Sequence, residues 1–531
     1  MLLLPFTGLY GHDSILRFHL LAILIKAIEE DCKHHANDWG GILSELSFSG
    51  RQQGLGIRLL ISVEISYLNP WKAHLFQYLP AGRTVMAEMR RFTLMDVLLL
   101  LAIVAAAAGI RAGYLITCAD YARNDGPVRV ETPLPELEPL VRNLKTQKRF
   151  ALTSPSTGEE EDTAAVSPGY PILMAGVNHL VDDAALDSTM RWVQCGLGAL
   201  TAGLYFLFAR RAFQSLIVAV LTGLLCAVHP FWILDTATLA DGTTATFLLG
   251  LILFLGVRSS QTGGPLASLL YGLSLAALAL VRAALLPFAI VGLAWFLWRS
   301  RVLVHGWLWA LLAFLGFIIG IGSWSFRNWQ LFGEAVPIVD STYYHLWIGN
   351  NPQATGGPNE NMKTPTEPFV PPSKRTERDT AFADEMRQEW RDRPVDSVRR
   401  HLRAGVYFVF GEHWFSKDRL ADPTGSEEIE PKWLADSYPV ALEWTMLVLL
   451  TLGLLGWRWT YGWRSSAMPS SLALIWIPLP YILSHAGALS GARLPLDGVL
   501  LCYTAFALAC LLPGRQALWD GERAIINPPH P

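Results

Sequence analysis

Residues 92–116 read FTLMDVLLLLAIVAAAAGIRAGYLI, an apolar run that is long enough to cross a membrane as a helix. A spanning helix needs about 20 mostly apolar residues. Outward from this run, the hydropathy predicts further spans near 191–209, 213–231, 240–257, 266–282, 284–298, 303–324, 439–457, 469–487 and 495–512. We therefore expect an all-α polytopic membrane protein with about ten transmembrane helices.

The composition of the 531-residue chain agrees with this class. Apolar residues make up 52% and charged residues 16%, against roughly 45–50% and about 25% in soluble proteins. Because single cores stop growing near roughly 250–300 residues, the apolar surplus must face a bilayer. A net charge of −3 gives no basic stripe for nucleic acid, and six cysteines without a CxxC pair make no disulfide framework or zinc site.

The N-terminal stretch, residues 1–85, differs from the rest of the chain. It mixes short apolar patches with scattered charge and holds no run that could span a membrane. Met86 and Met89 precede Arg90, Arg91 and the first span, which is how a polytopic protein commonly begins. We predict a start site assigned too far upstream, with a genuine amphipathic extension as the alternative.

The positive charges of the short loops predict the orientation, because Lys and Arg mark the cytoplasmic side. If the spans alternate, one side carries Arg90, Arg91, Arg210, Arg211, Arg258, Arg299, Arg301, Arg458, Arg464 and Arg515. The predicted organisation is a bundle over 86–324 with a first outer loop at 117–190, an outer, periplasmic loop region at 325–438, C-terminal transmembrane helices at 439–515 and a cytoplasmic tail at 516–531. We expect an inner (plasma) membrane protein whose site faces the outside.

The two long outer loops are expected to hold the chemistry, because connections beyond roughly 12–15 residues are usually functional or disordered. The first ends in the turn signal Ser167-Pro168-Gly169-Tyr170-Pro171, before an apolar stretch at 172–181 that we expect along the membrane interface. The second opens with Arg327-Asn328 and continues through Trp347-Ile348-Gly349-Asn350-Asn351-Pro352. It becomes helical in character from about Thr380 to Phe410.

In this order and at these positions, the motifs resemble those of the GT-C membrane glycosyltransferases. The likeness is to bacterial relatives of the protein O-mannosyltransferases (the dolichyl-phosphate-mannose-protein mannosyltransferase family 39) and the lipid A aminoarabinose transferases. It covers roughly residues 86–515. The resemblance implies an enzyme that moves one sugar from a polyprenyl-phosphate donor to a protein, lipid or glycan acceptor. Some members use a divalent metal ion and others do not, so the metal is left open.

The catalytic acid is expected just outside the first span, where the family carries it. A hydroxyl or amide acceptor is a weak nucleophile, so a carboxylate is needed to accept its proton or to orient it. Asp120 stands about four residues beyond the span and is the first candidate, with Glu136 or Glu138 as alternatives. Asp241, at the outer start of the fourth span, is expected to shape the site, to pair with an arginine, or only to cap its helix.

Arginines at the outer ends of spans are the candidates for the donor phosphate. The rigid guanidinium fork suits a phosphate, and Arg327, Arg493 and Arg282 occupy such ends. Snorkelling toward lipid headgroups is the alternative for each.

Substrate contacts are expected from an aromatic patch in the second loop. Its members are Tyr343, Tyr344, His345 and Trp347, followed by Asn350. These side chains suit a sugar or a prenyl chain, and an aromatic belt at the membrane interface explains them equally well.

Two other functions compete with a glycosyltransferase. A polytopic transporter or lipid flippase also has arginines among its spans, but transporters usually show internal repeats, and no self-similar halves are visible here. A catalytically inactive relative that acts as an assembly partner is the third possibility.

Overall fold

The computed structural model describes residues 93–124, 137–153, 158, 160–357, 363–366, 374–410, 448–449, 451–457, 467–484 and 492–511, with only the backbone at 117–124 and 410. The predictions for 1–85, the start site, Glu136 and the tail at 516–531 lie outside these residues.

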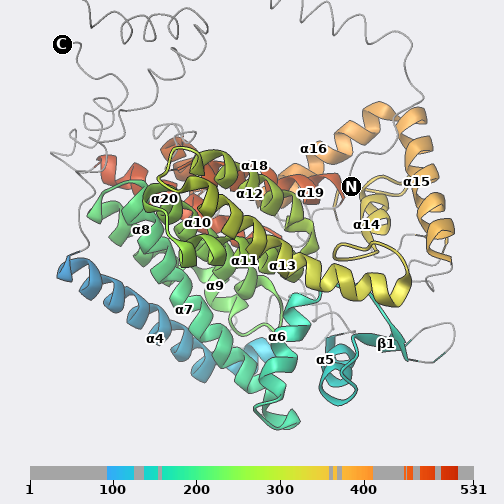
Figure 1. Cartoon of the computed structure of the whole chain (residues 1–531), viewed down its shortest axis with the longest axis horizontal. Helices are drawn as coiled ribbons and strands as arrows, with labels where there is room; N and C mark the ends of the chain where they lie inside the picture. Colours follow the sequence, from blue (N-terminus) through green and yellow to red (C-terminus); the bar gives the residue numbers. More distant parts are fainter. Residues whose placement is uncertain are drawn as a thin grey trace, which may run out of the picture. The chain divides into compact units, whose positions relative to one another are not determined.

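Long helices dominate the described chain (Figure 1). Six segments are long and apolar enough to cross a membrane: Leu94–Ile116, Asp183–Ala212, Gly242–Thr262, Ala283–Ser300, Gly306–Phe332 and Leu494–Leu511. Three shorter apolar segments accompany them, at Leu216–Val228, Pro265–Val281 and Met468–Leu483. The expected all-α membrane class is therefore confirmed, whereas the count of ten spans stays a prediction.

The bundle is built from helices α4 (Leu94–Asn124), α7 (Leu186–Ala212), α8 (Leu216–Val228), α10 (Gly242–Thr262), α11 (Pro265–Val281), α12 (Leu286–Ser300), α13 (Gly306–Phe332) and α20 (Leu494–Leu511). Small residues allow close helix packing, as is usual in membranes. A Cβ at Gly272 of α11 would lie 1.9 Å from the carbonyl oxygen of Ala313 in α13. The outer faces of α4 and α13 stay apolar and exposed, for example at Ile116 and Trp307, as a lipid-facing surface requires.

Prolines divide two of the predicted spans. The span expected at 469–487 is two helices, α18 (Met468–Trp476) and α19 (Pro478–Leu483), because the Pro478 nitrogen cannot donate a helical hydrogen bond. The span expected at 213–231 ends as α8 at Val228, and Pro230 starts the short helix α9 (Pro230–Asp235). Both breaks lie at the end of the bundle that carries the large loops, which we call the loop end.

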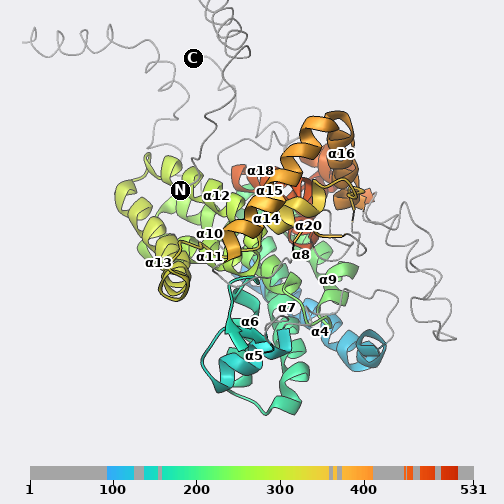
Figure 2. The same cartoon turned by 90° about the vertical axis from the view of Figure 1, so that its right-hand side faces the viewer.

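The loop end carries the remaining described elements (Figures 1 and 2). They are α5 (Leu137–Thr146), strands β1 (Ala151–Thr153) and β2 (Glu160–Asp162), α6 (Gly169–Asn178), the 3₁₀ turns η2 (Asp183–Ala185) and η3 (Ala283–Leu285), α14 (Thr342–Gly349), α15 (Arg375–Asp392) and α16 (Pro394–Phe410). The two strands pair antiparallel, with Ala151 opposite Asp162. Helix α6 buries Tyr170 and Met174 against α5 and α7, and its expected place along the membrane interface stays a prediction.

Three predicted boundaries need correction. Helix α4 continues to Asn124, so Asp120 stands on a helix and not in a loop. Helix α13 continues to Phe332, so Arg327 lies within its last turns rather than after them. The helix expected from Thr380 to Phe410 is two helices that part at Pro394, whose ring is tolerated only in a first helical turn.

A buried ion pair joins α7 to α4 at the end of the bundle opposite the loop end. Arg210, near the end of α7, places its Nε 2.7 Å from Oδ1 of Asp96 in the first turn of α4. Thr93 also donates its backbone N–H to this carboxylate, at 2.8 Å. The Asp96 carboxylate and the Arg210 guanidinium are therefore partnered within the protein.

Candidate functional site

Two predicted site residues pair with each other at the loop end. Arg282 follows α11, and its Nε and Nη2 donate to the two carboxylate oxygens of Asp241 at 2.7 and 2.6 Å. This fork-to-fork pair fixes both groups. Asp241 stands at the N-cap of α10 but makes no side-chain capping bond. Of the predicted roles of Asp241, pairing with an arginine is therefore the one that the structure shows.

Asp235 takes over the capping role and was missed from the sequence. Its Oδ2 accepts the Thr243 hydroxyl at 2.6 Å, and the Thr243 backbone also donates to this carboxylate. A Cβ at Gly242 would lie 2.7 Å from that oxygen, so the carboxylate occupies the space that a side chain would need. Asp235 thereby satisfies the start of α10 and leaves Asp241 available to Arg282.

Burial dominates the protonation of Asp235. The side chain is almost fully buried, and burial raises its pKa to about 7, although Thr243 and Arg282 act in the opposite direction. An acid at this depth, six residues before Asp241, is the sequence signal that could have identified it.

The Ser167–Pro171 motif holds the neighbourhood of Arg282 in place. Ser167 accepts the backbone N–H of Ala283 at 3.1 Å. Gly169 lies so close to α11 that a Cβ there would be 2.7 Å from the backbone nitrogen of Val281. The motif therefore docks α6 directly against the end of the helix that precedes Arg282.

Tyr170 of the same motif supports the segment that carries Asp235 and Asp241. Its hydroxyl donates to Gln194 Oε1 at 2.6 Å. The Gln194 amide donates in turn to the carbonyl oxygens of Thr236 and Thr238, at 3.0 and 2.6 Å. Gln194 was also missed from the sequence, since a glutamine inside a predicted span has no distinctive spacing.

Arg493 forms a second buried cluster with a different character. Its Nε lies 2.9 Å from Oδ1 of Asp497, and its Nη1 donates to the carbonyl oxygen of Val409. His229 approaches the other carboxylate oxygen, with 3.5 Å between Nε2 and Oδ2. Asp497 thus has a cationic partner on one side and an imidazole on the other.

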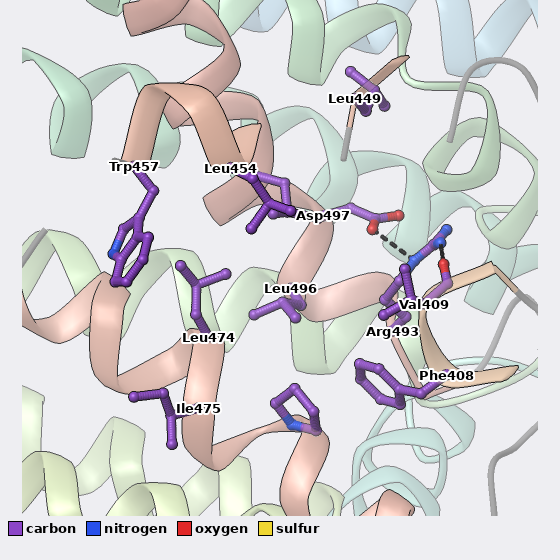
Figure 3. A pocket seen from close by; sticks show the side chains of 12 residues that line it. Phe408, Val409, Leu449, Leu454, Trp457, Leu474, Ile475, Arg493, Leu496 and Asp497 are labelled. Atoms are coloured by element: carbon purple, nitrogen blue, oxygen red, sulfur yellow. Dashed lines mark hydrogen bonds and ion pairs between the residues drawn. The ribbon is translucent and has the colours of Figure 1, made fainter. Parts of the chain in front are cut away.

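An apolar cavity of about 280 Å³ opens beside this cluster (Figure 3). Arg493 and Asp497 are its charged lining residues. The others are Phe408, Val409, Leu449, Leu454, Trp457, Leu474, Ile475, Pro478, Leu496 and Leu500. A concave apolar wall with few convergent polar groups is the usual form of a ligand site.

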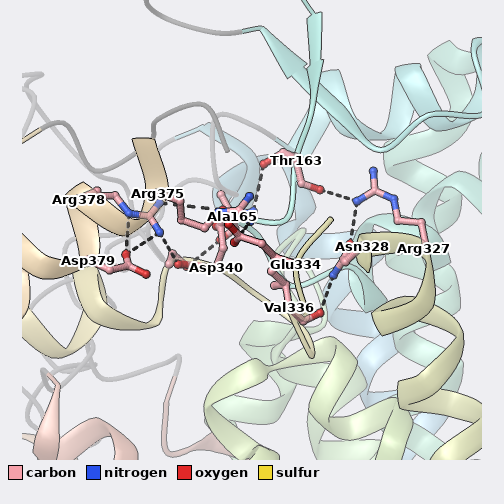
Figure 4. Close-up of polar contacts among 11 residues, drawn as sticks. Thr163, Ala165, Arg327, Asn328, Glu334, Val336, Asp340, Arg375, Arg378 and Asp379 are labelled. Atoms are coloured by element: carbon pink, nitrogen blue, oxygen red, sulfur yellow. Dashed lines mark hydrogen bonds and ion pairs between the residues drawn. The ribbon is translucent and has the colours of Figure 1, made fainter. Parts of the chain in front are cut away.

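Arg327 donates to several protein acceptors, and Figure 4 shows its contacts with Thr163 and Asn328. Its guanidinium donates to the carbonyl oxygens of Thr163 and Phe150 at 2.8 and 3.0 Å, and to Asp162 Oδ1 at 3.2 Å. It also lies 4.8 Å from the centre of the Trp324 ring. These contacts join α13 to the strand segment and argue against the predicted role in phosphate binding.

The polar contacts around Arg327 continue into α15. Arg375 places its Nε 2.9 Å from Oδ2 of Asp340, and Arg378 donates to the Asp340 carbonyl oxygen at 2.7 Å. Asp340 itself donates its backbone N–H to Ala164 at 3.0 Å. We call Arg327, Asp162, Asp340, Arg375 and Arg378 the loop-end polar network.

Two of the predicted substrate contacts are buried structural residues. Trp347 is fully buried and donates its indole N–H to Glu385 at 2.9 Å. Asn350 donates to the carbonyl oxygen of Leu483 at 2.7 Å and accepts the Trp390 indole at 2.8 Å. The expected substrate role of Trp347 and Asn350 is corrected to one of joining α14 to α15 and α19. Tyr343, at 43% exposure, stays accessible.

The two remaining candidate acids, Glu138 and Asp120, lie on different helices. Glu138 is exposed in the first turn of α5. The backbone of Asp120 lies on α4, and its side chain is outside the described residues. No group of three His, Cys, Asp or Glu side chains that could hold a metal ion occurs among the residues with described side chains. The metal is left open.

Comparisons with known proteins give little beyond this geometry. No protein-family model and no curated protein matches the chain. It is similar to the crystal structure of the Archaeoglobus fulgidus oligosaccharyltransferase in the apo form, with 14% identity, a TM-score of 0.46, and coverage of 81% of this chain and 52% of that one. For the same protein in complex with Zn and sulfate, the values are 12%, 0.40, 80% and 51%. The chain spans about half the length of these structures, and the values are too low to assign their fold or activity to it.

The fold and the site together define the class of the protein. It is a helical membrane protein with several apolar helices, and buried charged clusters lie at the loop end of its bundle. The most distinctive feature is an apolar cavity with an arginine and a carboxylate in its wall.

Proposed function

We propose that the chain is a membrane glycosyltransferase that moves a sugar from a polyprenyl-phosphate donor to an acceptor at the outer face of the membrane. The cavity beside Arg493 is the observation that carries this proposal. A polyprenyl phosphate combines a long apolar chain with an anionic head, and the cavity combines an apolar wall with a guanidinium. The resemblance of the ordered motifs to GT-C enzymes supports the same conclusion.

Arg493 is the residue that we assign to the donor phosphate. A guanidinium stabilises the charge that develops on the phosphate as the sugar leaves. A phosphate would compete with Asp497, whose Oδ1 lies 2.9 Å from Nε of Arg493, and His229, 3.5 Å from Oδ2, is a second partner for this carboxylate. Arg282 is held at both ends of its fork by Asp241, so we assign these two residues to the framework of the site.

Asp120 is the residue that we assign to the acceptor. It lies on the loop-end extension of α4, beyond the apolar segment that ends at Ile116. There it would accept the proton of the acceptor nucleophile, or orient it, while the sugar is transferred. Glu138 is the alternative base. Tyr343 and His345 are the exposed members of the aromatic patch and stay available to a substrate. The sugar and acceptor are set by loop shapes that differ within one fold.

Membrane location completes the proposal. The Lys and Arg pattern of the short loops supports a loop end that faces the outside of the inner (plasma) membrane. The donor, the bilayer, and a protein or glycolipid acceptor are the proposed partners. The need for a divalent ion is left open.

The test is transfer of radiolabelled sugar from a panel of polyprenyl-phosphate donors to total membrane acceptors, with purified protein in detergent and lipid. We expect transfer by the wild type and its loss in Asp120→Asn, because the carboxamide keeps the size but cannot accept a proton. Asp187→Asn, a change at an exposed acid in the first turn of α7, is the matched control and should keep full activity.

Two results would count against the proposal. Undiminished transfer by Asp120→Asn would move the base to Glu138. Absence of transfer from every donor, with the protein folded, would favour a transporter or an assembly partner.

A further inference from the structure

Helix α16 exposes an apolar stripe outside the membrane-spanning segments. The stripe consists of Val395, Val398, Leu402 and Val406, which are 71%, 49%, 68% and 38% exposed. At 3.6 residues per turn these four positions fall within about 80° of the helix circumference. Such a continuous strip differs from the scattered single apolar residues of an ordinary protein surface.

The opposite face of α16 is anchored in the protein. Ser397, Ala404 and Phe408 are buried, and the Phe408 ring stacks on Tyr481 of α19 with 5.7 Å between centroids. Arg400 donates to Glu389 of α15 at 2.8 Å. Because these contacts hold one face, the exposed stripe keeps a fixed direction.

Charge flanks the stripe on one side only. Arg399 and Arg403 lie next to the stripe on this side, and both are exposed. Arg399 lies 3.5 Å from the exposed carboxylate of Asp396, which is on the same side of the helix. Trp390, the last aromatic residue of α15, is 41% exposed next to the start of α16. Apolar residues flanked by arginine and tryptophan are typical of helices in the membrane interface, where the guanidinium meets lipid phosphates.

The neighbours of α16 give it a direction toward the bundle. It begins beside α15, whose exposed residues are polar apart from Trp390, and it ends against α19 (Figures 1 and 2). Its last turn supplies Phe408 and Val409 to the cavity beside Arg493 (Figure 3). The helix therefore leads from a polar surface to an apolar wall.

We infer that α16 is an interfacial helix whose stripe contacts the acyl chains of the outer leaflet, with Arg399 and Arg403 at lipid headgroups. This inference does not depend on the proposed enzymatic activity, and it takes the outer leaflet from the orientation given under the proposed function. Lipid is the occupant that fits, because the stripe is narrow, is flanked by cations, and continues toward a cavity among the apolar helices. Contact with the leaflet increases along the helix from Val395 to Val406.

The experiment uses nitroxide labels on the full chain in lipid nanodiscs, with reactive native cysteines replaced by serine. Labels at Val395→Cys, Leu402→Cys and Val406→Cys report the accessibility to oxygen, which collects in lipid, and to a water-soluble nickel chelate. Arg387→Cys is the control, because Arg387 is 71% exposed on α15. We expect the ratio of oxygen accessibility to nickel accessibility at Leu402 and Val406 to be several-fold above the ratio at Arg387. The ratio at Val395 should lie between these two levels.

Two outcomes would overturn the inference. Nickel accessibility at Leu402 and Val406 equal to that at Arg387 would place the stripe in water. Low accessibility to both reagents, with spin-spin broadening between labels, would show that a second copy of the chain covers the stripe.

Discussion

Arg327 and Arg493 are both predicted to bind the donor phosphate, but their surroundings differ. Arg327 meets two backbone carbonyl oxygens and the Asp162 carboxylate, and it also packs on Trp324. Arg493 has the Asp497 carboxylate and the Val409 carbonyl oxygen as its partners and lies in the wall of a cavity. Both arginines have a carboxylate and backbone carbonyl partners, and of the two only Arg493 lines the cavity. The comparison teaches that contact with a cavity, more than a place at a helix end, decides whether an arginine is available to a ligand.

The two regions also differ in how much solvent screens them. The side chains of Arg327 and Asp162 are 22% and 20% exposed, whereas those of Arg493 and Asp497 are 6% and 2% exposed. Removing one partner of a buried pair leaves an uncompensated charge. Substitutions should therefore have larger effects at Arg493 than at Arg327.

The largest effect is expected for Arg493→Ala. Loss of the phosphate partner should reduce sugar transfer about 100-fold or more, and the unpaired Asp497 should lower the free energy of unfolding by about 3–5 kcal/mol. The double variant Arg493→Ala/Asp497→Ala removes both charges and should regain stability but not transfer. Thermal unfolding and initial rates measure the two effects separately. Recovery of transfer in the double variant would remove Arg493 from the donor site.

Trp347→Ala should affect the loop end through stability alone. Truncating a fully buried tryptophan should cost about 3–5 kcal/mol, and it also leaves Glu385 without its indole donor. At a temperature where the variant is folded, its KM for the donor should equal that of the wild type. A raised donor KM in the folded variant would return Trp347 to the substrate site.

Arg327→Gln should have a smaller effect of the same kind. The variant loses hydrogen bonds to Phe150, Thr163 and Asp162, which should cost about 1–3 kcal/mol. The dependence of the transfer rate on donor concentration should stay as in the wild type. If donor affinity fell while the melting temperature held, the assignment of the two arginines would be reversed.

The effect at Asp235 depends on pH and is small over any single pH unit. Its pKa is raised to about 7, so the folded protein holds this proton between about pH 4 and 7 while the unfolded chain has released it. Its contribution to stability is therefore present at low pH and is lost as the pH rises toward 7. Relative to Asp235→Asn, the wild type should lose roughly 1 kcal/mol per pH unit over this range and nothing further above it. A difference in melting temperature between the two proteins that stays constant from pH 5 to 8 would contradict this.

The sequence predicts the membrane class because apolar runs of spanning length are a local property. The helices α4, α7, α10, α12, α13 and α20 all lie at predicted spans. Pro230 and Pro478 are also visible in the sequence. Whether a proline kinks, starts or ends a helix, however, depends on the neighbouring groups that satisfy the freed carbonyls. Helix ends such as Asn124 and Phe332 extend past the apolar residues, and hydropathy has no signal for this extension.

The site is less predictable because the role of each residue depends on contacts with residues that are distant in the sequence. The pairing of Asp241 with an arginine was among the expected roles, but Arg282 as the partner depends on two loops that meet only in the fold. Asp235 caps α10 in place of Asp241, because its carboxylate fits into the space that a side chain at position 242 would need. Trp347 and Asn350 have the composition of a sugar site, and only their burial distinguishes them from one.

The most direct test of the central claim is binding of a polyprenyl phosphate to the purified protein in nanodiscs, compared between two variants. Arg493→Ala/Asp497→Ala and Arg327→Gln each change one of the contrasted regions. We expect the first to lose binding and the second to bind as the wild type does. Retained binding in the first variant, or its loss in a folded Arg327→Gln protein, would contradict the assignment of the donor phosphate to the cavity beside Arg493.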